Sequence, residues 1–217
     1  MDHATHHHGH DPHGNVNAMA LSATLHCLTG CAIGEILGLM IGTAVGLSAG
    51  WTIALAVGLA FLFGYTLSML PLVKAGLGVG AALALVFAAD TLSIATMELV
   101  DNAVMAVIPG AMDAGLVNVV FWVGMMIALT AAFLAAYPVN RYLLQRGKGH
   151  ALTHAHHGSE AEPQGARRFI PSFGAGALVA VIIAFMVGGL VVSAASELDE
   201  PEREKSGHAE TTHAARN

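Results

Sequence analysis

Apolar residues fill five long stretches of the chain, which are separated by short polar or glycine-rich segments. The stretches run over about residues 23–47, 51–73, 77–99, 116–137 and 173–195. Each has the roughly twenty residues that an α-helix needs to cross about 30 Å of hydrocarbon. Helices are expected because every backbone group must find its partner inside a bilayer. The pattern predicts an all-α, polytopic membrane helix bundle with four core transmembrane helices and a fifth helix after them.

The third stretch continues beyond the length of one span. A continuous helix from Leu77 to Pro109 would be roughly 50 Å long, at about 1.5 Å per residue. We therefore expect its membrane part to end near Leu99. Asp101–Met112 would then form an interfacial helix or a turn, broken at the sequence Ile-Pro-Gly.

The composition agrees with a membrane protein and narrows the function. Hydrophobic residues make up 55% of the 217 residues and charged residues only 11%, whereas a soluble domain has about 25% charged residues. The net charge of −6 gives no support for nucleic-acid binding. The nucleotide-binding P-loop, the serine nucleophile elbow, the His-Glu-x-x-His zinc motif and the Cys-x-x-Cys-His haem motif are absent, so we do not expect an enzyme.

Basic residues predict the orientation in the membrane. Lys74 lies between the second and third stretches, and the segment between the fourth and fifth carries Arg141, Arg146, Lys148, Arg167 and Arg168. With five spans, these two loops fall on the same side, which the positive-inside rule makes cytoplasmic. We expect a multi-pass protein of the cytoplasmic (inner) membrane, with a cytoplasmic N-terminus and an acidic C-terminal tail outside.

The chain divides into five segments on this basis. Residues 1–21 form a His-rich, disordered cytoplasmic tail, 22–144 the four-helix membrane core, 145–172 a His-rich basic cytoplasmic loop, 173–196 the fifth helix and 197–217 an acidic disordered tail. Histidine tracts bind transition metals loosely through neutral imidazoles. The alternative is that the tracts are solvated and have no function.

Glycine recurs at every fourth position of the first span. The members of this stripe are Gly30, Gly34, Gly38, Gly42, Gly46 and Gly50. Small residues at this spacing let the backbone of another helix approach closely, which is how membrane helices pack. We expect this glycine zipper to be the central packing seam. The helix that packs against this glycine zipper would belong to this chain, to a partner membrane protein or to a second copy of this chain.

A second stripe borders the glycines and carries reactive side chains. Cys27, Cys31 and Glu35 are four residues apart, and His26 lies on the adjacent edge of the helix. Two thiolates at this spacing, with an imidazole as a third ligand, suit copper(I) or zinc. A redox pair is less well supported, because its usual spacing is Cys-x-x-Cys. The alternative is that both cysteines are small buried hydrophobic residues.

Carboxyl groups occur deep inside the spans. Glu35 and Asp90 lie near mid-membrane, where a charge costs a few kcal/mol or more and marks ion or proton pathways. Since the spans contain no Lys or Arg, these groups must be protonated, face water or hold a cation. Met97, Glu98, Asp101 and Met105 follow near one face, and the fourth span brings Met125 and Met126 to a similar depth. Thioethers bind copper(I), although a single Met more often fills a gap in a core.

Together these residues favour a membrane protein that handles transition-metal ions, with copper ahead of zinc, nickel and cobalt. Its candidate metal ligands are His26, Cys27, Cys31, Glu35, Asp90, Glu98 and Asp101. Its partners would be the lipid bilayer and the metal ion. Two alternatives stay open: a non-catalytic structural or assembly subunit that packs through the glycine zipper, and a proton-coupled carrier of another solute that uses Glu35 and Asp90.

Two motifs point to a known family. The sequence LHCLTGCAIGE contains His26, Cys27, Gly30, Cys31 and Glu35, and the later sequence DTLSIATMELVDN contains Asp90, Glu98, Asp101 and Asn102. Over about Leu21–Leu144 the chain resembles a family of small bacterial and fungal membrane proteins that is defined only as a domain of unknown function. The resemblance implies a core of about four helices, with the fifth span and the His-rich segments as additions. It implies no activity.

Overall fold

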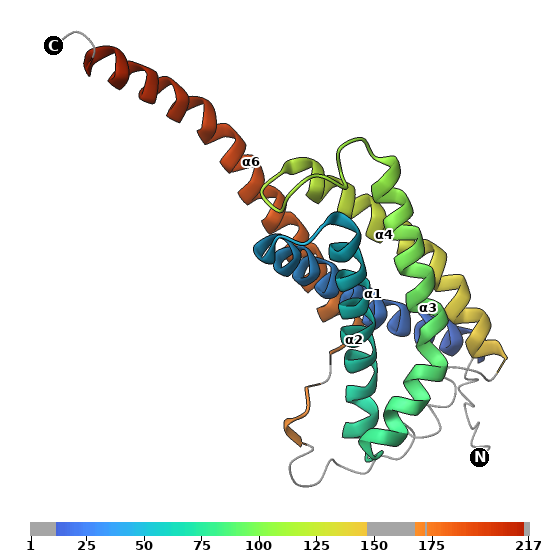
Figure 1. Ribbon diagram of the computed structural model, residues 1–217. Coiled ribbons are helices and arrows are strands. Elements are labelled where there is room, and N and C mark those ends of the chain that lie inside the picture. The colour runs from blue at the N-terminus through green and yellow to red at the C-terminus, as the bar shows by residue number, and fades with distance from the viewer. Residues whose placement is uncertain (1–11, 147–167, 172, 215–217) are drawn as a thin grey trace, which may run out of the picture.

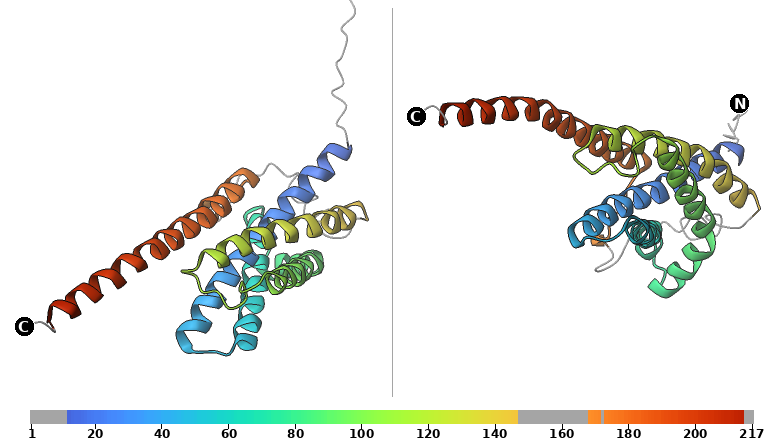
Figure 2. Two further views of the ribbon diagram at one scale, coloured as in Figure 1. Left: turned by 90° about the horizontal axis from the view of Figure 1, so that it is seen from above. Right: turned by 45° about the horizontal axis from the view of Figure 1, so that its top comes forward.

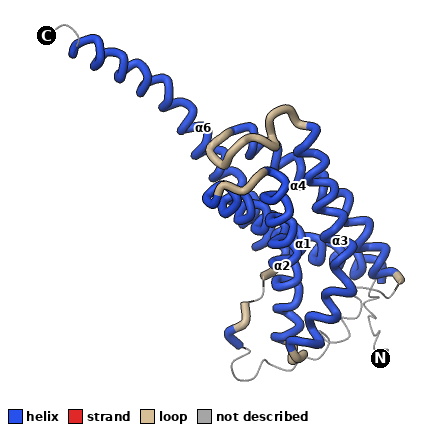
Figure 3. The backbone as a smooth tube through the Cα atoms, in the orientation of Figure 1, coloured by secondary structure: helices blue, strands red, loops and turns tan. Residues whose placement is uncertain are grey.

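The computed structural model describes residues 12–146, 168–171 and 173–214, and these form helices joined by short connections (Figure 1). The helices are α1 (Pro12–Val45), α2 (Ala49–Lys74), α3 (Val79–Val107), α4 (Val119–Gln145) and α6 (Ala175–Ala214). The described residues include no strand (Figure 3). Each helix contains a segment that is long and apolar enough to cross a membrane. The all-α membrane bundle predicted from the sequence is therefore confirmed.

Several helices are longer than the sequence predicts. The apolar pattern predicts only the part of each helix that lies in the hydrocarbon of the bilayer. The helix itself continues into polar residues as long as nothing breaks its hydrogen bonds. α1 begins at Pro12, before the apolar stretch, and α4 passes Pro138 and ends at Gln145. α6 continues to Ala214, so most of the tail expected to be disordered is helical. The membrane-compatible part of α6 is Ala175–Asp199.

The residues near Leu99, where the membrane part of the third stretch was expected to end, lie within one continuous helix. α3 continues through Asp101 to Val107, so Asp101–Val107 does not form the separate helix or turn that the sequence predicted. The break at Ile-Pro-Gly is confirmed. Ile108 is extended, with φ −78° and ψ 118°, because the ring of a following proline disfavours the helical conformation. Gly110 then takes φ 78°, where a side chain is rarely accommodated. Asp101 is therefore held on a rigid helix.

α1 lies at the centre of the bundle and contacts α2, α3, α4 and α6 (Figures 1 and 2). A tight turn at Gly46, with φ 70°, connects α1 to α2. Large apolar side chains such as Trp51, Leu99 and Leu134 are exposed on the outside of the bundle. An exposed apolar exterior around a polar interior is the arrangement expected of a protein surrounded by lipid.

The glycine zipper packs α1 against α2. A Cβ atom added at Gly30, Gly34 or Gly38 would overlap the backbone of Gly64, Ala60 or Ala56 on α2. At Gly42 it would overlap the side chain of Thr52, whereas Gly46 and Gly50 have open space around them. The packing seam predicted from the sequence is confirmed for four of the six glycines. Since α2 occupies it, this seam is not a free docking surface for another protein.

The N-terminal half of α6 is held against α4. Gly189 lies under the indole ring of Trp122, whose Nε1 donates to the carbonyl oxygen of Leu116 at 2.7 Å. The Ser193 hydroxyl donates to the same carbonyl at 3.1 Å. The backbone N–H of Val119 donates to the carboxylate of Glu197 at 3.0 Å, at the start of α4. Beyond this contact α6 extends away from the other helices (Figure 1).

Candidate cation site at the interface of α1 and α3

Cys27, Cys31 and Glu35 form one buried row on α1 that faces α3. They share that face because residues four apart in a helix lie one above the other. The row therefore lies beside the glycine zipper, and α1 presents small residues to α2 and reactive residues to α3. The second stripe predicted from the sequence has this position in the structure.

Acidic side chains of α3 lie opposite this row in three successive pairs. Cys27 interacts with Asp90, Cys31 with Glu98, and Glu35 with Asp101. All six side chains are buried. Cys27 also lies 4.0 Å from the hydroxyl of Ser68 on α2, measured from Sγ to Oγ. Three acidic residues of α3 are thus brought into side-chain contact with a row of two cysteines and one glutamate on α1, which spans about two helical turns.

The carboxyl groups beyond the first pair lack hydrogen-bond partners. Within the described residues, neither oxygen of Glu35 or Glu98 has a partner, and neither has Oδ1 of Asp101. α1 and α3 contain no Lys or Arg. Burying an ionised carboxylate without compensation costs many kcal/mol, so such a group is neutral or is balanced by a cation. The buried carboxyl groups of this interface are therefore either protonated or balanced by a cation.

His26 is not part of this row. Its side chain is half-buried, and its Nδ1 lies 2.8 Å from the carbonyl oxygen of Ser22 on its own helix. The described part of the chain contains no group of three or more His, Cys, Asp and Glu side chains arranged to hold one metal ion. The predicted ligands are therefore distributed as pairs along the interface and do not form a single coordination sphere. The predicted loop histidines at residues 150–157 and all of the predicted N-terminal tract except His13 lie outside the described residues.

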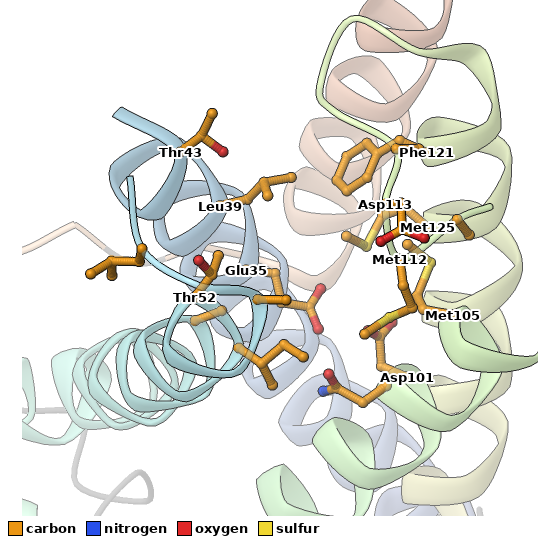
Figure 4. Close-up of a pocket in the computed structure, with 17 residues that line it drawn as sticks. Glu35, Leu39, Thr43, Thr52, Asp101, Met105, Met112, Asp113, Phe121 and Met125 are labelled. Carbon is orange, nitrogen blue, oxygen red and sulfur yellow. The ribbon is translucent and has the colours of Figure 1, made fainter. Parts of the chain in front are cut away.

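The row ends in a cavity of about 330 Å³. Its walls come from α1, α2, α3 and α4, from the turn that joins α1 to α2 and from the loop that joins α3 to α4. Glu35 and Asp101 lie on its inner side (Figure 4). Three thioether side chains, those of Met105, Met112 and Met125, also line it. The sequence pattern singled out Met105 and Met125 but not Met112, which lies in the loop after the helix break, where no helical periodicity applies.

The other two methionines singled out in the sequence, Met97 and Met126, pack in the hydrophobic core or against it. Met97 is 1% exposed and belongs to the central hydrophobic cluster, as Met105 and Met125 also do, and Met126 packs against that cluster. Neither Met97 nor Met126 lines the cavity. Both act as core residues in the described structure, which is the alternative that the sequence left open for them.

One family describes most of this chain. The profile for a domain of unknown function, DUF4396, matches residues 16–149. The chain belongs to the DUF4396 family. The DUF4396 region covers α1 from Val16 onward and all of α2, α3 and α4, with both halves of the acidic interface, whereas α6 lies outside it. No curated protein and no solved structure is significantly similar to the chain.

Proposed function

We propose that this DUF4396 protein handles transition-metal ions in the membrane, as a carrier or as an accessory protein, with copper as the favoured metal. The observation that carries the proposal is the burial of the Glu35, Glu98 and Asp101 carboxyl groups, of which both oxygens of Glu35 and Glu98 and Oδ1 of Asp101 have no hydrogen-bond partner among the described residues. A bilayer interior without a neighbouring Lys or Arg stabilises such groups only as neutral acids or as ligands of a cation.

The donors along the interface favour a metal over a simple cation. Thiol and carboxyl groups alternate from Cys27 to Asp101, and thioethers follow in the cavity. Soft sulfur ligands select copper(I), while carboxylates alone would suit magnesium or calcium. We propose a route in which the ion passes between the cavity and the Cys27–Asp90 pair by exchange from one pair to the next.

Metal content of the purified protein tests this function. The full chain, with the histidines of the tail and loop replaced by Asn, is purified in detergent and analysed by mass spectrometry of bound metals. We expect about one copper per chain, lost in Glu35→Gln/Asp101→Asn and reduced in Cys27→Ser/Cys31→Ser. Asp199→Asn is the matched control, because Asp199 is exposed on α6 and belongs neither to the row nor to the cavity lining. Equal metal content in all four proteins, or none in any, would overturn the proposal.

A proton-coupled carrier of another solute is the second candidate, and the contact between Glu35 and Asp101 favours it. Two carboxyl groups in contact readily share one proton. Such a carrier would keep its activity in Cys27→Ser/Cys31→Ser and lose it in Glu35→Gln or Asp90→Asn. Acidification of vesicles that contain the protein, followed with a pH-sensitive dye, separates the two candidates.

We also propose that the N-terminus faces the cytoplasm in the inner membrane. Lys74 ends α2, and Arg141 and Arg146 lie at the end of α4. These residues belong to the end of the bundle opposite the cavity, so the cavity would open outside. Reporter fusions after Lys74 and after Gly115 test this: an enzyme that is active only in the cytoplasm should report at the first position and not at the second.

A further inference from the structure

We propose that the cavity above Glu35 and Asp101 is a binding site for a soft monovalent metal ion, copper(I) or silver(I), with the thioethers of Met105, Met112 and Met125 as its sulfur ligands. This inference rests on the proposed function. It identifies the class of ion and a binding site for that ion at the cavity. The cysteine and carboxyl pairs alone identify neither.

The sulfur atoms are held by the fold. Met105 and Met125 are buried, from α3 and α4 respectively, with exposed fractions of 6% and 3%. The Met105 sulfur packs on the bare backbone of Gly124, where an added Cβ would lie 3.1 Å from it. Met112 belongs to the loop and is 41% exposed. Two thioethers are therefore fixed inside the cavity, and a third is accessible at its mouth (Figure 4).

A second, independent feature points to a cation. Glu35 and Asp101 are more than nine-tenths buried, line the same cavity and offer oxygens with no hydrogen-bond partner among the described residues. Thioethers are neutral and cannot balance a positive charge, whereas a carboxylate beneath them can. Methionines that only filled a gap would need no carboxylates below them.

The donor set separates ion classes. Zinc, nickel and cobalt bind thioethers poorly and prefer imidazole, thiolate or carboxylate, and calcium and magnesium prefer oxygen. Copper(I) and silver(I) accept two or three thioethers together with a carboxylate. The cavity should therefore bind silver(I) well in a protein whose cysteines have been removed, and it should bind zinc weakly.

Silver(I) titration of the full chain, followed by calorimetry, tests the site. The background carries Cys27→Ser/Cys31→Ser and the histidine replacements, so that thiols and imidazoles do not bind the probe. We expect about one silver ion per chain. Removing even outer-sphere partners of a metal costs about 10–100-fold in affinity, so Met105→Leu/Met112→Leu/Met125→Leu should lose at least that much. The matched control is Met97→Leu/Met126→Leu/Met186→Leu, which changes three methionines outside this cavity and should bind silver unchanged.

The outcomes separate this inference from the proposed function. Equal silver affinity in both triple variants would overturn the inference. Weak silver binding by the background protein would overturn the inference. If that protein nevertheless bound copper or zinc in an amount that depends on Glu35 and Asp101, the proposed function would stand. No metal of any kind would overturn both. Leu keeps the volume of Met, and where the cavity variant fails to fold, exposed Met112→Leu alone must still weaken silver binding.

Discussion

The backbone of Gly34 in α1 packs directly on the backbone of Ala60 in α2, with no space for a side chain between them. Gly30 and Gly38 have the same relationship with Gly64 and Ala56, one turn away on either side. This contact sets the distance between α1 and α2. It thereby also fixes which face of α1 is turned towards the acidic residues of α3.

Gly34→Leu should separate α1 from α2. Overpacking a tight contact costs about 1–3 kcal/mol or more, and a side chain against backbone is at the upper end. At about 2–4 °C per kcal/mol for a chain of this size, we expect the melting temperature in detergent to fall by several degrees. Gly58→Leu is the control, because Gly58 on α2 has open space around it and is exposed. Equal melting temperatures of the two variants would contradict the observed packing.

Gly189→Leu should release α6 from α4, whereas Gly188→Leu should not. A side chain at Gly189 would overlap the indole ring of Trp122, and one at Gly188 meets nothing within 4 Å. In a Trp51→Phe background Trp122 is the sole tryptophan, and it is 5% exposed. We expect a shift of its fluorescence to longer wavelength in Gly189→Leu only. An unchanged spectrum would show that α6 is not held through this ring.

Removing the Thr24 hydroxyl should destabilise the protein more than removing the Asn140 amide that donates to it. Asn140 Nδ2 donates to the Thr24 hydroxyl at 2.9 Å, and that hydroxyl donates to the Ala20 carbonyl at 2.7 Å. Thr24→Val leaves a buried amide without an acceptor, which costs about 1–3 kcal/mol. Asn140→Leu leaves the hydroxyl its bond to Ala20. We therefore expect Thr24→Val to be the more destabilising change in thermal unfolding, and the reverse order would contradict this bonding pattern.

Cys27 and Cys31 should be unreactive in the folded protein. Both are free thiols with at most 2% of their surface exposed. A maleimide reagent should label neither at a rate approaching that of a cysteine introduced at exposed Ser48 in a Cys27→Ser/Cys31→Ser background, and denaturant should expose both. Rapid labelling without denaturant would mean that the interface between α1 and α3 opens to water.

The sequence alone predicted the parts of this protein that depend on local order. The length of each apolar stretch is set by the bilayer, so the five helices followed from composition along the chain. Glycine and the pair of cysteines recur every four residues, so both stripes on α1 followed from the helical repeat. The burial of Glu35 and Asp90 followed from their place inside these stretches. The burial of Asp101 did not, because the membrane part of the third stretch was expected to end near Leu99.

Tertiary structure alone decided which stripe meets which helix. The local sequence does not determine that α2 packs on the glycines of α1, because small residues at this spacing can pack against any helix whose own contacting residues are also small. The pairing of Glu35 with Asp101, and the meeting of Met105, Met112 and Met125 in one cavity, depend on how far α3 continues and where its loop returns. These contacts follow from the packing of whole helices. For the same reason, only the folded chain showed that His26 is separate from the cysteine row.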